Sequence, residues 1–176
     1  MKYLIFIVIM FTSMASNVIF DFDTASDLKK WVIVDDVVMG GKSSGSFTLS
    51  PEGHGVFEGF VSLANNGGFS SVRHKFERKP VKSFSEIVLN VKGDGKNYQC
   101  RIKANSTDYY SYVSTFATNG DWQEIHIPLA EMYPSFRGRK LDQPNFSEGY
   151  LEEIAFLIGN KKEEGFELMI DKIGLK

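Results

Sequence analysis

The sequence predicts an all-β protein built as a β-sandwich of two sheets. Beyond residue 16, apolar residues recur at every second position in short runs, and clusters of Gly, Asn and Ser separate these runs. This alternation is typical of antiparallel strands with one buried face. Hydrophobic residues make up 43% of the chain and aromatic residues 14%, which argues against a disordered protein and supplies bulky side chains for a core. About ten strands at this spacing fit two packed sheets.

The expected strands follow one another along the whole chain. Four runs alternate strictly: Ile87, Leu89 and Val91; Tyr98, Cys100 and Ile102; Ile125, Ile127 and Leu129; and Phe166, Leu168 and Ile170. Further strands are expected at residues 18–22, 31–34, 47–49, 56–63, 69–75, 110–116 and 154–158. Helix is limited to about one turn at residues 25–30, with Thr24 as the N-cap, and another at residues 129–133. Trp122 begins the third run, so we expect its indole to close one end of the core.

Residues 1–15 resemble a secretory signal peptide. Lys2 is followed by nine apolar residues, and Ser13 and Ala15 then supply the small residues that signal peptidase requires. The apolar run is short for a membrane-spanning helix, which needs ~20 residues. We therefore expect cleavage before Ser16, a single domain over residues 16–176, and an exported protein that is periplasmic or secreted. The alternative is a protein tethered to the membrane by this segment.

Charge and cysteine content exclude several kinds of partner and site. With 20 basic and 22 acidic residues the net charge is −2, so the chain has no overall attraction for nucleic acid or anionic membranes. The single Cys100 excludes an intramolecular disulfide, and the three histidines lack metal-ligand spacing. Asp21, Asp23 and Asp171 leave a structural calcium ion open, although the first two alternate with phenylalanines as in an ordinary strand. We expect no cofactor and no resident metal.

Two motifs imitate enzyme sites, but neither has the context that its chemistry needs. Residues 41–45 match the Gly-x-Ser-x-Gly pattern of a hydrolase nucleophile elbow, which requires a helix after the serine, whereas a strand is expected at residues 47–49. Residues 41–43 also resemble the end of a phosphate-binding loop. Its first glycine would fall on Asp36, whose carboxylate would repel phosphate. The sequence therefore predicts a protein without enzymatic activity.

Two glycine-containing loops, at residues 34–43 and 65–73, carry the most specific pattern in the chain. Each combines glycines with acidic or amide residues and one large apolar residue, which indicates a loop of defined shape. With further landmarks at residues 93–98, 112–116, 122–129, 136–139 and 165–173, they resemble the complex I intermediate-associated protein 30 (CIA30) family over about residues 20–173. The resemblance implies a jelly-roll β-sandwich similar to galactose-binding-like domains, and a role in the assembly of respiratory complex I.

The expected function is that of a protein-binding module that assists the assembly or stability of a membrane-associated protein complex. A subunit of a respiratory complex is the candidate partner. The candidate binding residues belong to the non-periodic segments that carry charged or amide groups beside glycines: Asp36, Met39, Asn66, Arg137 and Arg139. We expect loops 36–43 and 65–69 and segment 136–139 to meet at one end or face of the sandwich.

Two roles remain open for the arginines of segment 136–139. Asp35 and Asp36 are natural counter-charges for them, which would make the three segments one binding site. Alternatively, Arg137 anchors the long segment 128–150 to the sandwich through Asp36 or Asp94.

A carbohydrate-binding module is the alternative function. Tyr109, Tyr110 and Tyr112, near Trp122, could stack on sugar rings. However, Tyr110, Tyr112 and Phe116 share one strand parity, which is typical of packing between sheets. Tyr109 has the opposite parity and is expected at the surface.

A nucleic-acid partner is not expected. Four basic residues are interleaved with Tyr98, as in proteins that bind single strands: Lys92, Lys96, Arg101 and Lys103. The slightly acidic net charge opposes this interpretation.

Overall fold

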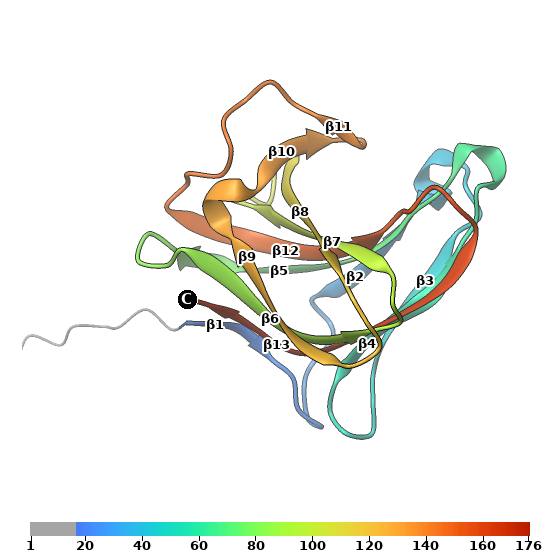
Figure 1. Cartoon of the computed structure of the whole chain (residues 1–176), viewed down its shortest axis with the longest axis horizontal. Coiled ribbons are helices and arrows are strands. Elements are labelled where there is room, and N and C mark those ends of the chain that lie inside the picture. The colour runs from blue at the N-terminus through green and yellow to red at the C-terminus, as the bar shows by residue number, and fades with distance from the viewer. Residues whose placement is uncertain (1–16) are drawn as a thin grey trace, which may run out of the picture.

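Two antiparallel sheets form a β-sandwich, as the sequence pattern predicts, and it is a jelly roll, as the family resemblance implies. The structure is a computed structural model that describes residues 17–176, so the expected signal segment and its cleavage site lie outside the described residues. Figure 1 shows the two sheets as layers, with β10 and β11 standing above β12 and β5 on the side away from β13 and β4. Within residues 17–176, no helix has the length and apolar character needed to span a membrane.

The six-stranded sheet has the order β3-β4-β13-β6-β9, and β1 also pairs with β13. Its strands are β1 (Val18–Asp21), β3 (Ser44–Leu49), β4 (Gly55–Val61), β6 (Glu86–Gly93), β9 (Trp122–Pro128) and β13 (Glu164–Leu175).

The seven-stranded sheet has the order β11-β10-β8-β7-β12-β5-β2. Its strands are β2 (Trp31–Asp35), β5 (Ser70–Pro80), β7 (Asn97–Lys103), β8 (Ser111–Ala117), β10 (Tyr133–Phe136), β11 (Arg139–Lys140) and β12 (Tyr150–Ile158). Three short 3-10 helices complete the described chain: η1 (Asp36–Met39), η2 (Ala64–Asn66) and η3 (Leu129–Glu131).

The core lies between the sheets and follows the predicted alternation. Ile87, Leu89 and Val91 of β6 point inward, as do Phe156 and Ile158 of β12, and all five are fully buried. Burying one such side chain contributes about 1.5–3 kcal/mol of hydrophobic free energy. The outward residues of the same strands are therefore free to carry function.

Residues 25–30 do not form the expected helical turn. The Asp23 carboxylate accepts a hydrogen bond from the Ala25 backbone N–H at 2.9 Å, and the Ser26 hydroxyl donates to the same oxygen at 3.0 Å. These bonds close a tight turn that competes with helix, as short polar side chains do.

The expectation that Trp122 closes the core is wrong, and Trp31 has that role. Residue 122 shares the parity of Glu124 and His126, so its ring faces outward, where it is 42% exposed. Trp31 is 7% exposed and stacks on Phe47 and His74, with ring centroids 4.8 Å and 4.6 Å away. The core therefore closes with β2 rather than β9.

We predict that Trp31→Ala lowers the free energy of unfolding by about 3–5 kcal/mol, because it leaves a large cavity among packed rings. Trp122→Ala is the matched control and should cost less than about 1 kcal/mol, as an exposed residue does. Denaturant titration of both variants measures the difference. Equal losses would contradict the assignment of Trp31 to the core.

Candidate functional site

Asp36 joins the two glycine-containing loops from a fully buried position at the start of η1. Its carboxylate accepts hydrogen bonds from the backbone N–H groups of Ser43 at 3.0 Å, Gly68 at 2.6 Å and Phe69 at 3.2 Å. The Ser43 hydroxyl donates a further bond. Burial alone would raise the pKa of Asp36, but these hydrogen bonds outweigh it and hold the pKa below its usual value. The carboxylate is therefore charged and fixes the shape of both loops.

The glycines of the two loops make room for this carboxylate. A Cβ atom on Gly41 would lie 2.2 Å from one carboxylate oxygen of Asp36, and one on Gly67 would lie 2.5 Å from the other. Gly40 ends η1 with φ at +88°, a backbone conformation that favours glycine. Figure 1 shows η1 and η2 side by side at one end of the sandwich, and the Asn65 amide donates to the Gly40 carbonyl at 3.0 Å.

Asp35 and Asp36 are not the counter-charges of the arginines. Asp35 accepts hydrogen bonds from the Gly45 backbone N–H at 2.9 Å and the Ser70 hydroxyl at 2.6 Å. Asp36 is occupied by the loops. Among the described residues, neither carboxylate forms an ion pair with Arg137 or Arg139.

The alternative anchor through Asp94 is also wrong. The Asp94 carboxylate accepts from Lys96, from the Tyr98 hydroxyl at 2.9 Å and from the Glu167 backbone N–H at 3.0 Å. Its charge is used where the β6–β7 turn meets β13, far in the chain from segment 128–150.

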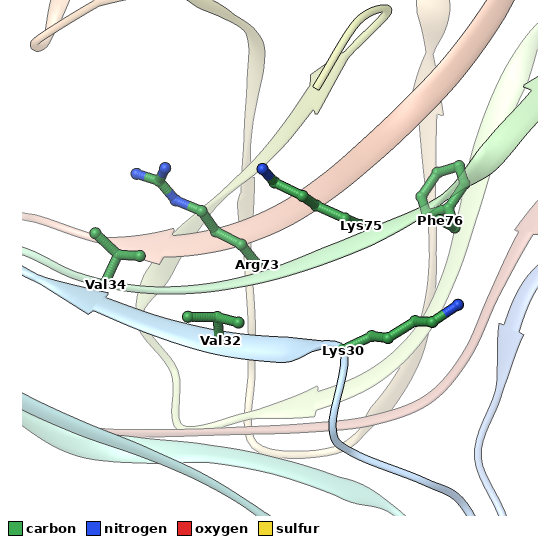
Figure 2. A pocket seen from close by; sticks show the side chains of 6 residues that line it. All are labelled: Lys30, Val32, Val34, Arg73, Lys75 and Phe76. Carbon is green, nitrogen blue, oxygen red and sulfur yellow. The ribbon is translucent and has the colours of Figure 1, made fainter. Parts of the chain in front are cut away.

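A groove lies on the outer face of the seven-stranded sheet and consists of two adjoining hollows. The larger measures about 620 Å³, and its lining includes Met39, Phe69, Arg101, Tyr109, Phe136 and Arg137. The smaller measures about 560 Å³ and is lined by Lys30, Val32, Val34, Arg73, Lys75 and Phe76. Figure 2 shows Arg73 and Lys75 on β5 and Val32 and Val34 on β2. All four side chains project to the same side of the sheet. Arg73 and Val34 line both hollows, so the two form one continuous groove.

Strand register places the groove's basic residues in two rows. In the first row Arg73 of β5 and Arg101 of β7 flank Ala155 of β12. In the second row Lys75 and Lys103 flank Glu153. The β12 residues of both rows are buried although they face outward, so they form the floor of the groove.

The two rows differ in how their charges are compensated. Burial lowers the pKa of Lys103. The Glu153 carboxylate, 4.0 Å from the Lys103 ammonium, partly offsets this effect. Burial, and then the charge of Arg73, lower the pKa of Arg101. The Arg101 Nε is buried without a hydrogen-bond partner. Within residues 17–176, no carboxylate forms a salt bridge with Arg73 or Arg101.

The five candidate binding residues occupy different positions around this groove. Met39, which is 55% exposed, and Arg137 line the groove, whereas Asp36 is buried and does not line it. The Arg137 guanidinium lies 5.2 Å from the centre of the Phe136 ring. Asn66 on η2 and Arg139 on β11 are exposed and do not line the groove. The structure thus brings the two loops together through Asp36 and places Arg137 in the same groove as Met39 and Phe69.

Sequence reasoning missed Arg73 and did not connect Arg101 with it. The outward parity of Arg101 and Lys103 was visible in the alternation, but their neighbour across β12 depends on sheet order. The basic set considered for nucleic acid does not assemble on one face. Tyr98 is 1% exposed in the core, and Lys92 lies on β6 of the other sheet.

Comparison with known families gives a match over nearly the whole described chain. The family model described as complex I intermediate-associated protein 30 (CIA30) matches residues 20–170. "Complex I intermediate-associated protein 30, mitochondrial" of Drosophila melanogaster is 28% identical over 96% of this chain and 66% of its own length. The Mus musculus protein of the same description is 26% identical, covering 91% of this chain and 56% of its own length. The chain thus spans between about half and two thirds of the length of the curated relatives that it matches.

Solved structures share the fold at low sequence identity. A family 11 carbohydrate-binding module from Clostridium thermocellum, in complex with a mixed-linked tetrasaccharide, has a TM-score of 0.66 at 15% identity and covers 93% of this chain and 96% of its own. An exo-β-agarase has a TM-score of 0.58 at 10% identity, covering 92% of this chain and 25% of its own. At these identities the likeness shows the β-sandwich fold alone.

The expectation of an exported protein is wrong. The relatives are described as mitochondrial proteins, not as periplasmic or secreted ones. The basic start, the apolar run and the small residues Ser13 and Ala15 are typical of a secretory signal, but they do not identify the compartment.

We predict that Asp36→Asn lowers the free energy of unfolding at neutral pH by about 1–3 kcal/mol, because an amide cannot accept from all four donors. The pKa of Asp36 is lowered in the folded state, so its contribution is present above the unfolded value of 3.8 and is lost as pH falls through the folded pKa. The difference from the unsubstituted protein should therefore shrink in acid. Denaturant titrations across pH measure it, with the exposed Asp121→Asn as the control. A pH-independent difference would contradict this account.

Proposed function

Because the chain belongs to the complex I intermediate-associated protein 30 family, we propose that it is a non-enzymatic protein-binding module that assists the assembly of respiratory complex I. The family match over residues 20–170 carries the proposal. The partner is then a subunit of the respiratory complex or of one of its assembly intermediates. The family description names association with a complex I intermediate and no reaction, which supports a binding role.

The loop rim, defined as η1 with the residues just before and within η2, is the proposed contact surface. Val37, Met39 and Leu63 are 59%, 55% and 42% exposed there. Exposed apolar side chains on loops of fixed shape suit a protein interface, because little conformational entropy is lost on binding. We propose Met39, Asn66, Arg137 and Arg139 as contact residues, with Asp36 as the residue that positions the rim.

Carbohydrate is a second candidate ligand. Tyr109 and Phe136 meet edge to face at the groove, with ring centroids 5.2 Å apart, and aromatic rings of this kind stack on sugars. The groove floor between β5 and β7, however, carries Arg73 and Arg101 instead of aromatic rings. A glycan array is the direct test of this candidate, and strong selective binding to a neutral glycan would favour it over a protein partner.

Depletion and affinity capture in the native cell test the proposed function. Loss of the chain should lower the amount of assembled complex I. A tagged copy should restore it and co-purify with complex I subunits identified by mass spectrometry. Normal complex I without the chain, or recovery of no complex I subunit, would overturn the proposal.

We predict that Met39→Glu lowers the recovery of complex I subunits at least several-fold, because it places a charge in an apolar contact surface. Its thermal midpoint should change by only a few degrees, since residue 39 is exposed. Trp122→Ser is the matched control, because it removes an exposed apolar side chain from the other sheet and should leave capture unchanged. Equal capture by both variants would remove the loop rim from the interface.

A further inference from the structure

Two arginines on the groove floor lack a counter-charge within the described chain. Arg73 lies close enough to Arg101 for its charge to disfavour the charged form of Arg101, and burial acts in the same direction. The Nε of Arg101 is buried and donates to no described group. Since a buried donor without a partner costs free energy, the fold does not gain stability from this arrangement. Such groups cluster at binding sites, where a ligand supplies the missing partner.

The geometry of the pair suits one small planar anion. Arg73 and Arg101 stand on strands separated only by β12, and neighbouring strands lie ~4.8 Å apart, so their backbones are about 10 Å apart. Ala155, the residue between them, is small and leaves space above the sheet. Two long side chains can therefore converge on one carboxylate, and the guanidinium fork matches the two oxygens of that group.

We propose that Arg73 and Arg101 bind a side-chain carboxylate of an acidic, partly apolar segment of the protein partner. This inference rests on the proposed function in that it takes the partner to be a protein. It adds the chemistry by which the groove recognises that partner, and it places the contact on the sheet face as well as on the loop rim.

The surroundings of the pair favour an acidic protein segment over a phosphate or a nucleic acid. Val32, Met39, Tyr109 and Phe136 are exposed apolar residues that line the groove on either side of the arginines. Such a lining can pack against apolar side chains next to a carboxylate, whereas a free phosphate has no apolar part to contact it. Because the whole chain carries a net charge of −2, its positive groove would steer an acidic segment locally without attracting nucleic acid overall.

The row next to the pair limits how many carboxylates the groove takes. Glu153 already lies 4.0 Å from the Lys103 ammonium, so this second row has its own anion. The row of Arg73 and Arg101 has no such carboxylate, because Ala155 stands between the two arginines. This favours a segment that places one carboxylate at the pair over a run of consecutive acidic residues.

Fluorescence anisotropy with defined peptides tests the inference. The probe is a short capped peptide in which glutamate alternates with valine, and the control peptide has glutamine in place of every glutamate. The acidic peptide should bind at least about tenfold more tightly, and its affinity should fall as salt is added. Equal affinity for the two peptides, or tighter binding of inorganic phosphate or a single-stranded oligonucleotide, would overturn it.

Substitutions separate recognition from a structural role. Arg101→Gln and Arg73→Gln should each weaken binding of the acidic peptide about tenfold or more, whereas Lys92→Gln on the other sheet should not. Arg101→Lys keeps the charge but loses the fork, so its affinity should be intermediate. Neither glutamine variant should have a lower thermal midpoint, because each removes repulsion between the arginines. A large drop in midpoint with unchanged peptide binding would assign the pair to structure and contradict the proposal.

Capture from mitochondria distinguishes failure of this inference from failure of the proposed function. If the unsubstituted chain recovers complex I subunits and Arg101→Gln and Arg73→Gln recover them equally well, the arginine pair is not part of the interface and the inference fails alone. If the unsubstituted chain recovers none, the proposed function fails, and the protein partner named here falls with it.

Discussion

The buried carboxylate of Asp36 is the interaction on which the shape of the two glycine-containing loops depends. It accepts from four donors on two loops: the N–H and hydroxyl of Ser43, 7 residues away in the chain, and the N–H groups of Gly68 and Phe69, 32 and 33 residues away. Water cannot replace these bonds inside the fold, so removing the carboxylate would leave several donors unsatisfied at once. The glycine pattern follows from the same constraint, because Gly41 and Gly67 approach the carboxylate more closely than any Cβ atom could.

Strand register imposes the second constraint, since it fixes which outward side chains share the groove. Alternation sends Cys100 and Ile102 into the core and leaves Arg101 and Lys103 outside. Pairing with β12 then brings Arg73 of β5 into the same row as Arg101. A shift of one residue in either pairing would bury the arginines and expose the core, so the position of the groove is determined by the same packing that stabilises the sandwich.

Alternation is a local signal, so it is sufficient to predict antiparallel strands in two sheets, whereas the jelly-roll topology is implied only by the family resemblance. The four strict runs predict strands that the structure contains, and an error arose where parity was not followed, at Trp122. Asp36 and Met39 were identifiable as special because their loop departs from every regular period. Arg73 was not identifiable, because it meets Arg101 only across β12. Ala155, the β12 residue between them, comes more than 80 residues after Arg73 in the chain. No local pattern predicts which strand will lie beside a given residue. The N-terminal segment shows a separate limit, because its residue pattern suggests the wrong compartment.

The likeness to carbohydrate-binding modules concerns the fold alone, and one fold can present different chemistry on its outer faces. Both inner faces of a sandwich must be apolar, which leaves the outer face of each strand free to vary without cost to the core. A sugar is recognised by aromatic planes and neutral polar groups, whereas the row of Arg73, Ala155 and Arg101 presents two charged forks above a small residue. Ligand class is therefore determined by a few outward positions on β5 and β7, and these positions in this chain select for negative charge.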